Sequence, residues 1–450
     1  MLHRYEPSRT APYRARRQQI LETLSARQAA ALIPAARPKA RNADTEHRYR
    51  PDSDFWRLTG FGEPHAALLL LPKVGERAAR SVLFLRPRDR EQEIWSGLRL
   101  GVERACEALG VDEARPIEQL WKELPTLLEG CTQLCYRTGV DAANDAEVLA
   151  TLTRMRAKPR SPLPWPQEIV DTAPLLHEAR LFKDAAELSA MRRAAEITAA
   201  GHAAALRIAR PGVNEREVEA RLEYEFRRLG ADAPAYNSIV AGGANACVLH
   251  YVENDAPLAD GELLLIDAGA EFEHYACDVT RTFPVGRRFS AEQRALYDVV
   301  LRAQLAALAI VRTGTTIDQI HQCALRALVE GLCEHKLLPE SVDEALASGS
   351  YKRFYMHRTS HWLGLDVHDG GAYVRDGASR ALEPGMVITV EPGLYVAPDE
   401  ASVEPRWRGI GIRIEDDVLV TAGGSEVLTA AIPKQADALE ELRREALHSA

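Results

Sequence analysis

The chain has 450 residues, of which 46% are hydrophobic and 27% charged, values that are typical of a globular protein with two domains rather than one. Its formal net charge of −9 argues against nucleic-acid binding, which requires a basic surface. The chain contains no apolar run approaching the roughly 18 residues of a membrane-spanning helix.

The cysteine pattern indicates a reducing environment. The seven cysteines are widely spaced and form no CxxC pair, so neither a disulfide framework nor a thiolate zinc site is expected. We therefore expect a cytoplasmic protein. The arginine-rich start, residues 1–20, lacks an apolar signal segment, and we interpret it as a solvent-exposed first helix.

Residues 1–175 alternate short apolar runs with helical patterns, which predicts an α/β domain. The domain contains no GxGxxG or P-loop motif, so nothing in it indicates nucleotide binding. The predicted strands are 29–34, 66–71, 81–85 and 133–137, and the predicted helices are 102–109, 117–128 and 142–155.

A connector follows this domain. The sequence KPRSPLPWP places Pro159, Pro162, Pro164 and Pro166 within eight residues, a density that sustains neither a helix nor a central strand. We place the domain boundary between this segment and Lys183, giving domains 1–175 and 176–450.

The second domain contains a repeat that is visible in its helix caps. Four pairs, each with a capping residue and an acid or amide three positions later, open four amphipathic helices. In each half two helices precede a group of predicted strands, so we expect two similar halves whose sheets meet. The cap pairs are Asp184/Glu187, Asn214/Glu217, Ser290/Gln293 and Thr316/Gln319; the helices are expected to end near Pro211, Gly230, Gly314 and Glu334; the strands are 238–241, 263–267, 277–284, 386–391 and 411–420.

Each half also delivers two acids from its strands. Asp267 ends the apolar run LLLI, Asp278 follows a polar turn, and Glu391 and Glu415 lie in TVEPG and IRIED. Buried carboxylates are costly unless they are paired, protonated or bound to a metal. Two surface aspartates beside a hairpin would explain the first pair alone, but the repetition favours one site between the halves.

Histidines accompany these acids. The segment MHRTSHWLGLDVHD carries His357, His361 and His368 within twelve residues, a density that favours function over structure. Four carboxylates and an imidazole suit Mn²⁺, Fe²⁺, Co²⁺ or Zn²⁺, and two ions balance four negative charges better than one. Paired ions about 3.5–4 Å apart generate a hydroxide near neutral pH, so hydrolysis is the expected chemistry.

The spacing of Asp267, Asp278, His361, Glu391 and Glu415, with the phrases IDAG, DVTRTFPV, HWLGLDVHD, VEPGLY and GIRIEDD, resembles the pita-bread metallopeptidases and, among them, the Xaa-Pro aminopeptidases (aminopeptidase P). The resemblance extends over almost the whole chain, including DSDFWRLTGFGEP and EIWSGLRLG near the start. It implies an α/β N-terminal domain followed by an α+β pita-bread catalytic domain that binds two divalent ions, with Mn²⁺ expected.

The resemblance also implies individual roles. Asp267 would bind one ion, Asp278 and Glu415 would bridge both, and His361 with Glu391 would complete the other. His250, His357 and His368 match histidines that bind substrate and stabilise the tetrahedral intermediate, and Glu391 could shuttle a proton. Tyr395 and Arg413 match positions that line the pocket or fix the ligands.

The N-terminal domain would limit access to the narrow end of a peptide chain. In the family, contacts also come from a neighbouring subunit, and Trp95 and Asp44 match positions expected to contribute to substrate binding. A homodimer or homotetramer is therefore expected. Departures from the pattern are few: Arg358 and Thr359 stand where a smaller pair is usual, and Cys277 beside Asp278 is interpreted as a packed thiol.

The predicted function is metal-dependent release of the residue that precedes a penultimate proline, with peptides as the partners. An Xaa-Pro dipeptidase shares the same ligands and stays an alternative. Methionine aminopeptidase usually lacks the N-terminal domain, and a metal-free creatinase-type enzyme does not need the complete ligand set. A peptide-binding module without activity would be expected to have lost ligands, whereas all five are present.

Overall fold

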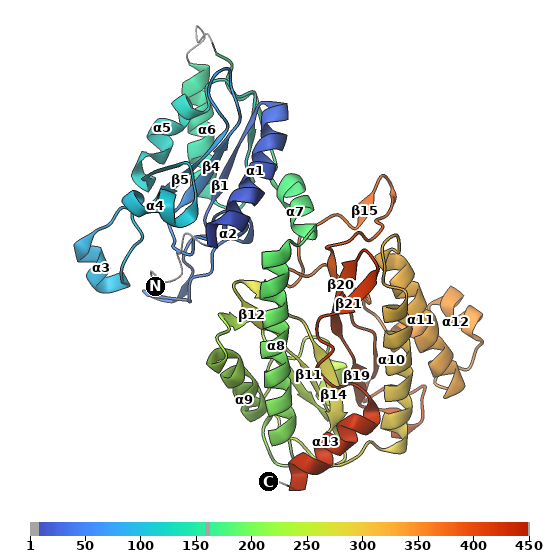
Figure 1. Cartoon of the computed structure of the whole chain (residues 1–450). Helices are drawn as coiled ribbons and strands as arrows, with labels where there is room; N and C mark the ends of the chain where they lie inside the picture. The colour runs from blue at the N-terminus through green and yellow to red at the C-terminus, as the bar shows by residue number, and fades with distance from the viewer. Residues whose placement is uncertain (1–8, 158–162, 449–450) are drawn as a thin grey trace. The chain divides into compact units, whose positions relative to one another are not determined.

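The structure is a computed structural model that describes residues 9–157 and 163–448. The chain divides into two compact units, residues 1–179 and 180–450, each with its own core (Figure 1).

The N-terminal unit is built on one six-stranded sheet with the order β6-β5-β4-β1-β7-β8. The central strands β1, β4 and β5 are largely apolar and buried because both faces are covered. Alternate residues such as Ala31 and Leu70 pack on one face against α1, α2 and α4, whereas Leu32 and Leu69 pack on the other against α5 and α6. The pairing is antiparallel for β1/β4 and β4/β5 and parallel elsewhere.

The predicted elements of this unit are present, although 117–128 opens as a 3₁₀ turn. Helices α2, α3 and α7 and the short strands β2, β3, β6 and β8 were missed. The bounds are α1 Thr10–Arg27, β1 Ala29–Pro34, β2 Ala40–Asn42, β3 Thr45–Glu46, α2 Ser53–Thr59, β4 Ala67–Leu71, β5 Arg80–Leu85, α3 Arg90–Ser96, α4 Val102–Leu109, β6 Glu113–Pro116, η3 Ile117–Gln119, α5 Leu120–Leu127, β7 Gln133–Cys135, α6 Ala142–Arg156, β8 Glu168–Val170 and α7 Ala173–Leu181.

The predicted first helix forms, but only one side of it is exposed to solvent. Helix α1 buries Ile20, Leu21 and Leu24, and Arg17 is only 2% exposed. The Arg17 guanidinium donates to the carbonyl of Leu58 near the end of α2 and to the carbonyls that end α4. A cation that bonds the last carbonyls of two helices is favoured by their dipoles, so burial of this arginine holds three helices together. Residues 1–8 of the predicted segment lie outside the described residues.

The C-terminal unit contains the predicted repeat. All four predicted cap pairs form reciprocal capping boxes, at the starts of α8, α9, α10 and α11. The helix pairs α8/α9 and α10/α11 flank the strands from opposite sides (Figure 1). Helices α8 and α10 end earlier than expected, at Ile208 and Ala309, because Gly212 and Gly314 turn to donate to the carbonyls of Leu258 and Leu382.

The two glycines have φ values of +86° and +89°, so each half makes the same turn at the same place. The bounds of this unit are α8 Ala185–Ile208, α9 Glu215–Arg228, β9 Ala233–Pro234, β10 Ile239–Gly242, η4 Gly243–Cys247, β11 Leu263–Asp267, β12 Ala270–Phe272, β13 Tyr275–Ala276, β14 Thr280–Pro284, α10 Ala291–Ala309, α11 Ile317–Glu334, α12 Val342–Ser348, η5 Ser350–Arg353, β15 Val374–Arg375, β16 Ala378–Ser379, β17 Val387–Val390, β18 Gly393–Val396, η6 Pro405–Trp407, β19 Ile410–Arg413, β20 Asp416–Thr421, β21 Gly424–Val427 and α13 Ala436–His448.

Each half contains a long hairpin that is interrupted once. In the first half, the chain leaves β11 after Asp267 and re-enters at Thr280 of β14, with the β12/β13 hairpin between them. In the second half, the expected single strand 411–420 is instead two strands, β19 and β20, with Glu415 in the gap. The expected strand 277–284 likewise starts only at Thr280. The prediction was wrong at these two places because the acids lie where the chain changes its pairing partner.

Close approach of the backbone at the first interruption requires a glycine. A Cβ on Gly269 would lie 1.6 Å from the carbonyl oxygen of Cys277, which is far inside van der Waals contact. Ala268 and Cys277 keep ladder hydrogen bonds on either side of this point, to Val279 and Ala270. The glycine therefore allows the two segments that carry Asp267 and Asp278 to lie very close to each other.

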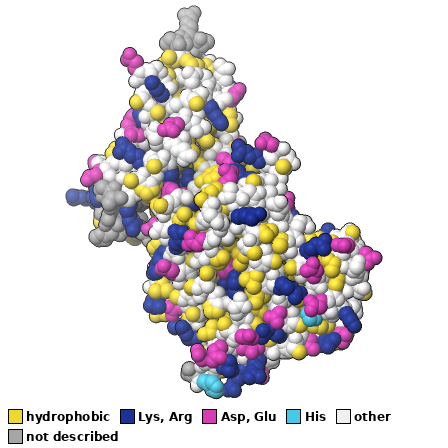
Figure 2. Space-filling model, turned by 45° about the vertical axis from the view of Figure 1, so that its right-hand side comes forward, with side chains coloured by type: hydrophobic (Ala, Val, Ile, Leu, Met, Phe, Trp, Pro, Cys, Tyr) yellow, Lys and Arg dark blue, Asp and Glu magenta, His cyan; other side chains and the backbone are white. Residues whose placement is uncertain are grey.

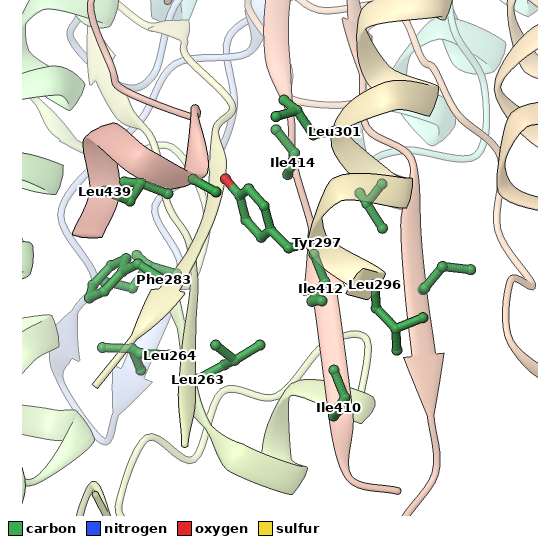
Figure 3. Close-up of a cluster of buried hydrophobic side chains, with 14 of the residues drawn as sticks. Leu263, Leu264, Phe283, Leu296, Tyr297, Leu301, Ile410, Ile412, Ile414 and Leu439 are labelled. Atoms are coloured by element: carbon green, nitrogen blue, oxygen red, sulfur yellow. The ribbon is translucent and has the colours of Figure 1, made fainter. Parts of the chain in front are cut away.

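The main core lies where strands of the first half meet β19 and helix α10 of the second. Figure 3 shows Leu264 and Phe283 on one side, Ile412 and Ile414 on the other, and Tyr297 between them. These side chains are at most 2% exposed. Burial of this apolar surface, worth about 25 cal/mol per Å², fixes the two halves against each other and so fixes the acids that they carry.

A buried ion pair links the two halves below the acids. Arg281 on β14 donates to Asp416 Oδ1 at 2.7 Å and to the carbonyls of Glu415 and Thr280. Asp416 is fully buried and also accepts from Gln304, Thr429 and Lys434. Burial opposes ionisation of this carboxyl, but the charges of Arg281 and Lys434 outweigh it and lower its pKa.

The surface carries charged side chains of both signs. On the face drawn in Figure 2, acidic and basic side chains are interspersed. Among the described residues, no helix is both long and apolar enough to cross a bilayer. All seven cysteines are free, and Cys277 is buried in an apolar cluster.

The Arg281–Asp416 pair yields a stability prediction. Asp416→Ala leaves a buried arginine and lysine without their carboxylate, which costs about 3–5 kcal/mol and lowers the thermal unfolding midpoint by roughly 6–15 °C. The matched control is Asp298→Ala, which removes an exposed partner of Arg294 and should change the midpoint by less than about 2 °C. Equal midpoints for the two variants in a circular-dichroism melt would contradict the role given to Asp416.

Candidate metal centre

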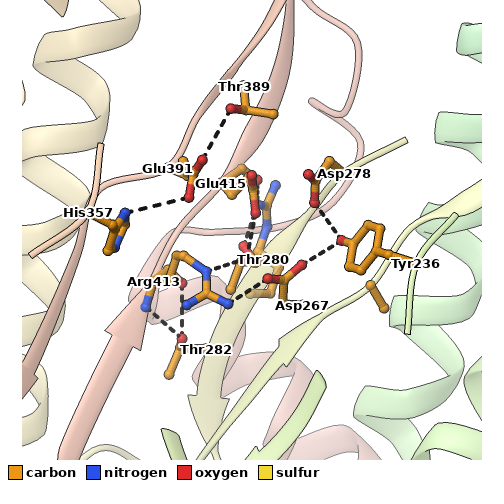
Figure 4. A network of polar contacts seen from close by, with 12 residues as sticks. Tyr236, Asp267, Asp278, Thr280, Thr282, His357, Thr389, Glu391, Arg413 and Glu415 are labelled. Atoms are coloured by element: carbon orange, nitrogen blue, oxygen red, sulfur yellow. Dashed lines mark hydrogen bonds and ion pairs between the residues drawn. The ribbon is translucent and has the colours of Figure 1, made fainter. Parts of the chain in front are cut away.

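The five residues predicted as metal ligands line one cavity of about 950 Å³ in the C-terminal unit. Asp267 comes from the end of β11, Asp278 from the loop before β14, and Glu391 and Glu415 from the interruptions of the second hairpin. His361 lies on the segment between η5 and β15. The side chains converge because the interruptions of both hairpins face the same cavity (Figure 4).

Three of these residues have the geometry of a metal site. One ligand atom each from Asp278, His361 and Glu415 lies within 4.8 Å of the others. His361 Nε2 is 3.4 Å from Asp278 Oδ2 and 3.5 Å from Glu391 Oε1, which brings a fourth ligand to the same place. His361 Nδ1 lies 3.0 Å from the carbonyl of Trp362, so this nitrogen carries the proton and Nε2 is left to bind a cation.

Tyr236 connects the fifth predicted ligand, Asp267, to this group. Its phenol oxygen lies 2.5 Å from Asp267 Oδ1 and 2.5 Å from Asp278 Oδ1. Burial, followed by the charges of both aspartates, raises the Tyr236 pKa well above its ordinary value, so the phenol stays a donor. Tyr236 was not predicted from the sequence, because no charge pattern or motif spacing around the single tyrosine of the segment APAYNS distinguishes it.

Arg413 is the buried cation of the centre. Its guanidinium donates to Asp267 Oδ2 at 2.5 Å, to Tyr395 Oη at 2.9 Å and to Thr280 Oγ1 at 2.9 Å. Thr280 in turn donates to Glu415 Oε2 at 2.6 Å. The arginine therefore orients acids from both halves. Thr280 was also missed as an individual residue, although it lies within the motif DVTRT.

The acids cannot all be ionised without more positive charge than the protein supplies. Burial, then the charge of Asp278, raises the pKa of Glu415 well above its ordinary value, and burial raises that of Glu391 to about 7. Burial also raises the pKa of Asp267 against the pull of Arg413. Hard carboxylate oxygens with one imidazole are a donor set that fits Mn²⁺, Fe²⁺, Co²⁺ or Zn²⁺, so the residues present suit a divalent cation.

His361 and Asp278 differ from the other ligands, because their pKa shifts favour the charged form of both side chains. Burial disfavours the charged imidazole, but the hydrogen bond to Asp278 and the charges of Glu391 and Asp278 prevail and raise the His361 pKa to about 9. The same hydrogen bond lowers the Asp278 pKa although burial opposes it. A divalent cation between these ligands would take the place of the imidazole proton.

The other three predicted histidines also line the cavity. His357 Nε2 lies 2.9 Å from Tyr395 Oη, and its Nδ1 is 2.8 Å from the carbonyl of Arg358 and 3.7 Å from Glu391 Oε2. Burial and the Arg413 charge lower the His357 pKa to about 4, so it is neutral. His368 stacks edge-on to His361 with ring centroids 4.4 Å apart, and His250 is exposed on the turn after η4.

Two predicted substrate-binding residues belong to the other unit. Trp95 lies on α3 and is 88% exposed, and Asp44 lies in the exposed turn between β2 and β3. Their roles stay a prediction.

Tyr236→Phe should weaken binding of Mn²⁺ by about tenfold, because loss of an outer-shell hydrogen bond leaves two ligands less firmly oriented. Titration calorimetry measures the affinity. The control is Tyr251→Phe, which removes a phenol that donates to Glu215 outside the cavity wall and should leave the affinity unchanged. Equal affinities of the two variants would show that Tyr236 does not position the ligands.

Binding of Mn²⁺ should release protons and should tighten as the pH rises from about 6 to 9. Below its pKa of about 7 Glu391 is protonated, and below about 9 His361 is protonated, so the cation competes with protons at low pH. Calorimetry at pH 7 in two buffers of different ionisation enthalpy counts the released protons. An affinity that is independent of pH, without proton release, would contradict this coupling.

Comparisons with known proteins agree with this site. Residues 189–422 match the model of metallopeptidase family M24, and residues 13–136 match the aminopeptidase P N-terminal domain. The chain is 46% identical to the Xaa-Pro aminopeptidase of Escherichia coli strain K12 over 430 residues, 96% of this chain and 97% of that protein.

Solved structures show the same relationship. The aminopeptidase PepP of Pseudomonas aeruginosa is 47% identical, with a TM-score of 0.94 over 98% of this chain and 99% of that one. A zinc-substituted aminopeptidase P of Escherichia coli in complex with product is 45% identical, with a TM-score of 0.93 over 97% and 98%. The chain therefore belongs to metallopeptidase family M24 and, within it, to the Xaa-Pro aminopeptidases, with the predicted α/β and pita-bread domains.

Proposed function

We propose that the chain hydrolyses the peptide bond between an N-terminal residue and a penultimate proline, with two divalent cations, most simply Mn²⁺, held by Asp267, Asp278, His361, Glu391 and Glu415. The observation that carries this proposal is the convergence of all five side chains in one cavity of a member of this family. The zinc-substituted relative supports a metal in this fold. Asp278 and Glu415 are the acids proposed to contact both cations.

The residues around the cations suit this reaction. Bound cations would polarise the scissile carbonyl and supply a hydroxide near neutral pH. Glu391, with its pKa raised to about 7, is suited to take a proton from the attacking water and pass it to the leaving proline nitrogen. His250 and His368 on the cavity wall are placed to donate to substrate carbonyls, and Tyr395 joins Arg413 to His357.

The substrate's own chemistry fits a metal-based mechanism. Proline has no N–H, so a peptidase that binds its substrate as a hydrogen-bonded strand loses a contact there. Polarisation of the carbonyl by cations needs no such contact. The free amino terminus of the peptide is proposed to lie beside the carboxylates that hold the cations.

The N-terminal unit is proposed to restrict access and to contribute to a homodimer or homotetramer. Helix α3 and the residues directly after it support this role, because Ile94, Trp95 and Leu98 are 81%, 88% and 50% exposed. Apolar side chains gathered in this way are typical of an interface. Trp95 and Asp44 would then serve a partner's substrate. The seven free cysteines support a reducing, cytoplasmic location.

The test compares an Xaa-Pro-Xaa tripeptide with the matching Xaa-Pro dipeptide, each with added Mn²⁺ and after chelation. Cleavage of the tripeptide that needs the metal and exceeds cleavage of the dipeptide is expected. The reverse preference would make the protein an Xaa-Pro dipeptidase with the same ligands. Hydrolysis of neither peptide by the metal-loaded protein would overturn the proposal.

Asp278→Ala is the inactive reference in this assay. It should lower kcat by at least about 10³-fold, because it removes an acid that is shared between both proposed cations, while the circular-dichroism spectrum stays that of a folded protein. Asp298→Ala, an exposed change in the same unit, should keep full activity. Substantial turnover by Asp278→Ala with its metal content intact would refute the bridging role.

A further inference from the structure

The cavity wall carries an ion pair that the reaction described above does not use. Arg358 follows His357 on its loop, and Asp318 lies in the first turn of α11. Arg358 Nη2 is 2.8 Å from Asp318 Oδ1, and the side chains are 66% and 49% exposed. Both residues line the cavity. The pair is therefore in contact with solvent and with any molecule that fills the cavity.

Arg358 differs from the other arginine of the cavity. Among the described residues that line the cavity, Arg413 and Arg358 are the arginines, and lysine is absent from this set. Arg413 is 4% exposed and is bonded to Asp267, Tyr395 and Thr280. Arg358 has one exposed partner, and an exposed ion pair of this kind is worth at most about 1 kcal/mol, so a stronger or additional anion can take its place.

The distribution of charge gives the cavity a polarity. Four acids of its lining are balanced by the two proposed divalent cations, whereas Arg358, beside His357, is an exposed cation of the same lining. A short peptide has a positive amino end and a negative carboxyl end. Arg358 repels the amino end and attracts the carboxyl end, so the favourable orientation places the carboxyl end near Arg358.

The position of Glu391 indicates the same direction. Glu391 is the residue proposed to pass a proton to the leaving nitrogen, so it borders the leaving-group side of the peptide. His357 Nδ1 is 3.7 Å from Glu391, and Arg358 is the next residue in the chain. The leaving-group side is therefore proposed to lie toward the loop that carries His357 and Arg358, and the C-terminal carboxylate of a short substrate on that same side.

We propose that Arg358 binds the C-terminal carboxylate of short peptide substrates, in exchange for or together with Asp318, and so makes the enzyme favour free-acid tripeptides over C-terminally blocked ones. This specificity rests on the proposed function. An arginine suits the role because its planar fork matches a carboxylate.

The test uses Mn²⁺-loaded protein and three peptides of one Xaa-Pro-Xaa series: the free acid, the C-terminal amide, and an amide with aspartate as third residue. The unsubstituted protein should show a KM for the free acid about three- to fivefold below that for the amide. In Arg358→Gln this advantage should disappear. The control Arg192→Gln removes another exposed arginine, paired with Glu426 outside the cavity lining, and should retain the advantage.

Two further readouts separate binding from structure. Asp318→Asn removes the competing carboxylate and should widen the free-acid advantage by about twofold, and high salt should narrow it in the unsubstituted protein. A free-acid advantage that survives in Arg358→Gln, or a fall in kcat that is equal for acid and amide, overturns the proposal. An Arg358→Gln effect confined to the aspartate-containing amide also overturns it, because the ligand is then a side chain.

The two proposals fail in different ways. If the unsubstituted protein hydrolyses the amide and the free acid equally well, the peptidase function stands and the role of Arg358 falls. If it hydrolyses none of the three peptides, the proposed function itself falls.

Discussion

The structure depends on holding four carboxylates close together in a buried cavity. Like charges at this range repel, and burial adds to the cost of ionisation, so the acids need both fixed positions and nearby positive charge. Arg413, Tyr236 and His361 supply hydrogen bonds to the acids within the protein. The negative charge of the carboxylates that these groups do not balance suits divalent cations, and the chemistry of the site follows from the need to bind them.

The fold meets this requirement by repetition. Each half has two capped helices, the same glycine turn after its first helix, and a long hairpin with one interruption. At an interruption of the strand pairing, an acidic side chain can point into the cavity while the strands on either side keep their regular pairing. Two interruptions that face each other bring four acids together. Gly269 allows the first crossing because any larger residue would collide with the carbonyl of Cys277. The Arg281–Asp416 pair then ties the two interruptions to each other.

The cavity also carries two kinds of charge. The four acids are proposed to be balanced by bound cations, whereas Arg358, beside His357, is an exposed cation of the lining. Selection at the carboxyl end of the substrate needs a separate cation, and the exposed pair of Arg358 with Asp318 provides one without disturbing the buried network.

The sequence by itself determined the features that depend on near neighbours. The capping boxes of Asp184, Asn214, Ser290 and Thr316 join residues three positions apart, so they were predicted correctly. The acids that end apolar runs were visible for the same reason. Tertiary structure alone decided the break at Glu415, the bridge from Tyr236 to two aspartates, and the burial of Arg17. These depend on contacts between distant segments: Arg413 and Asp267 are 146 positions apart, and no local pattern encodes which distant carboxylate an arginine will meet.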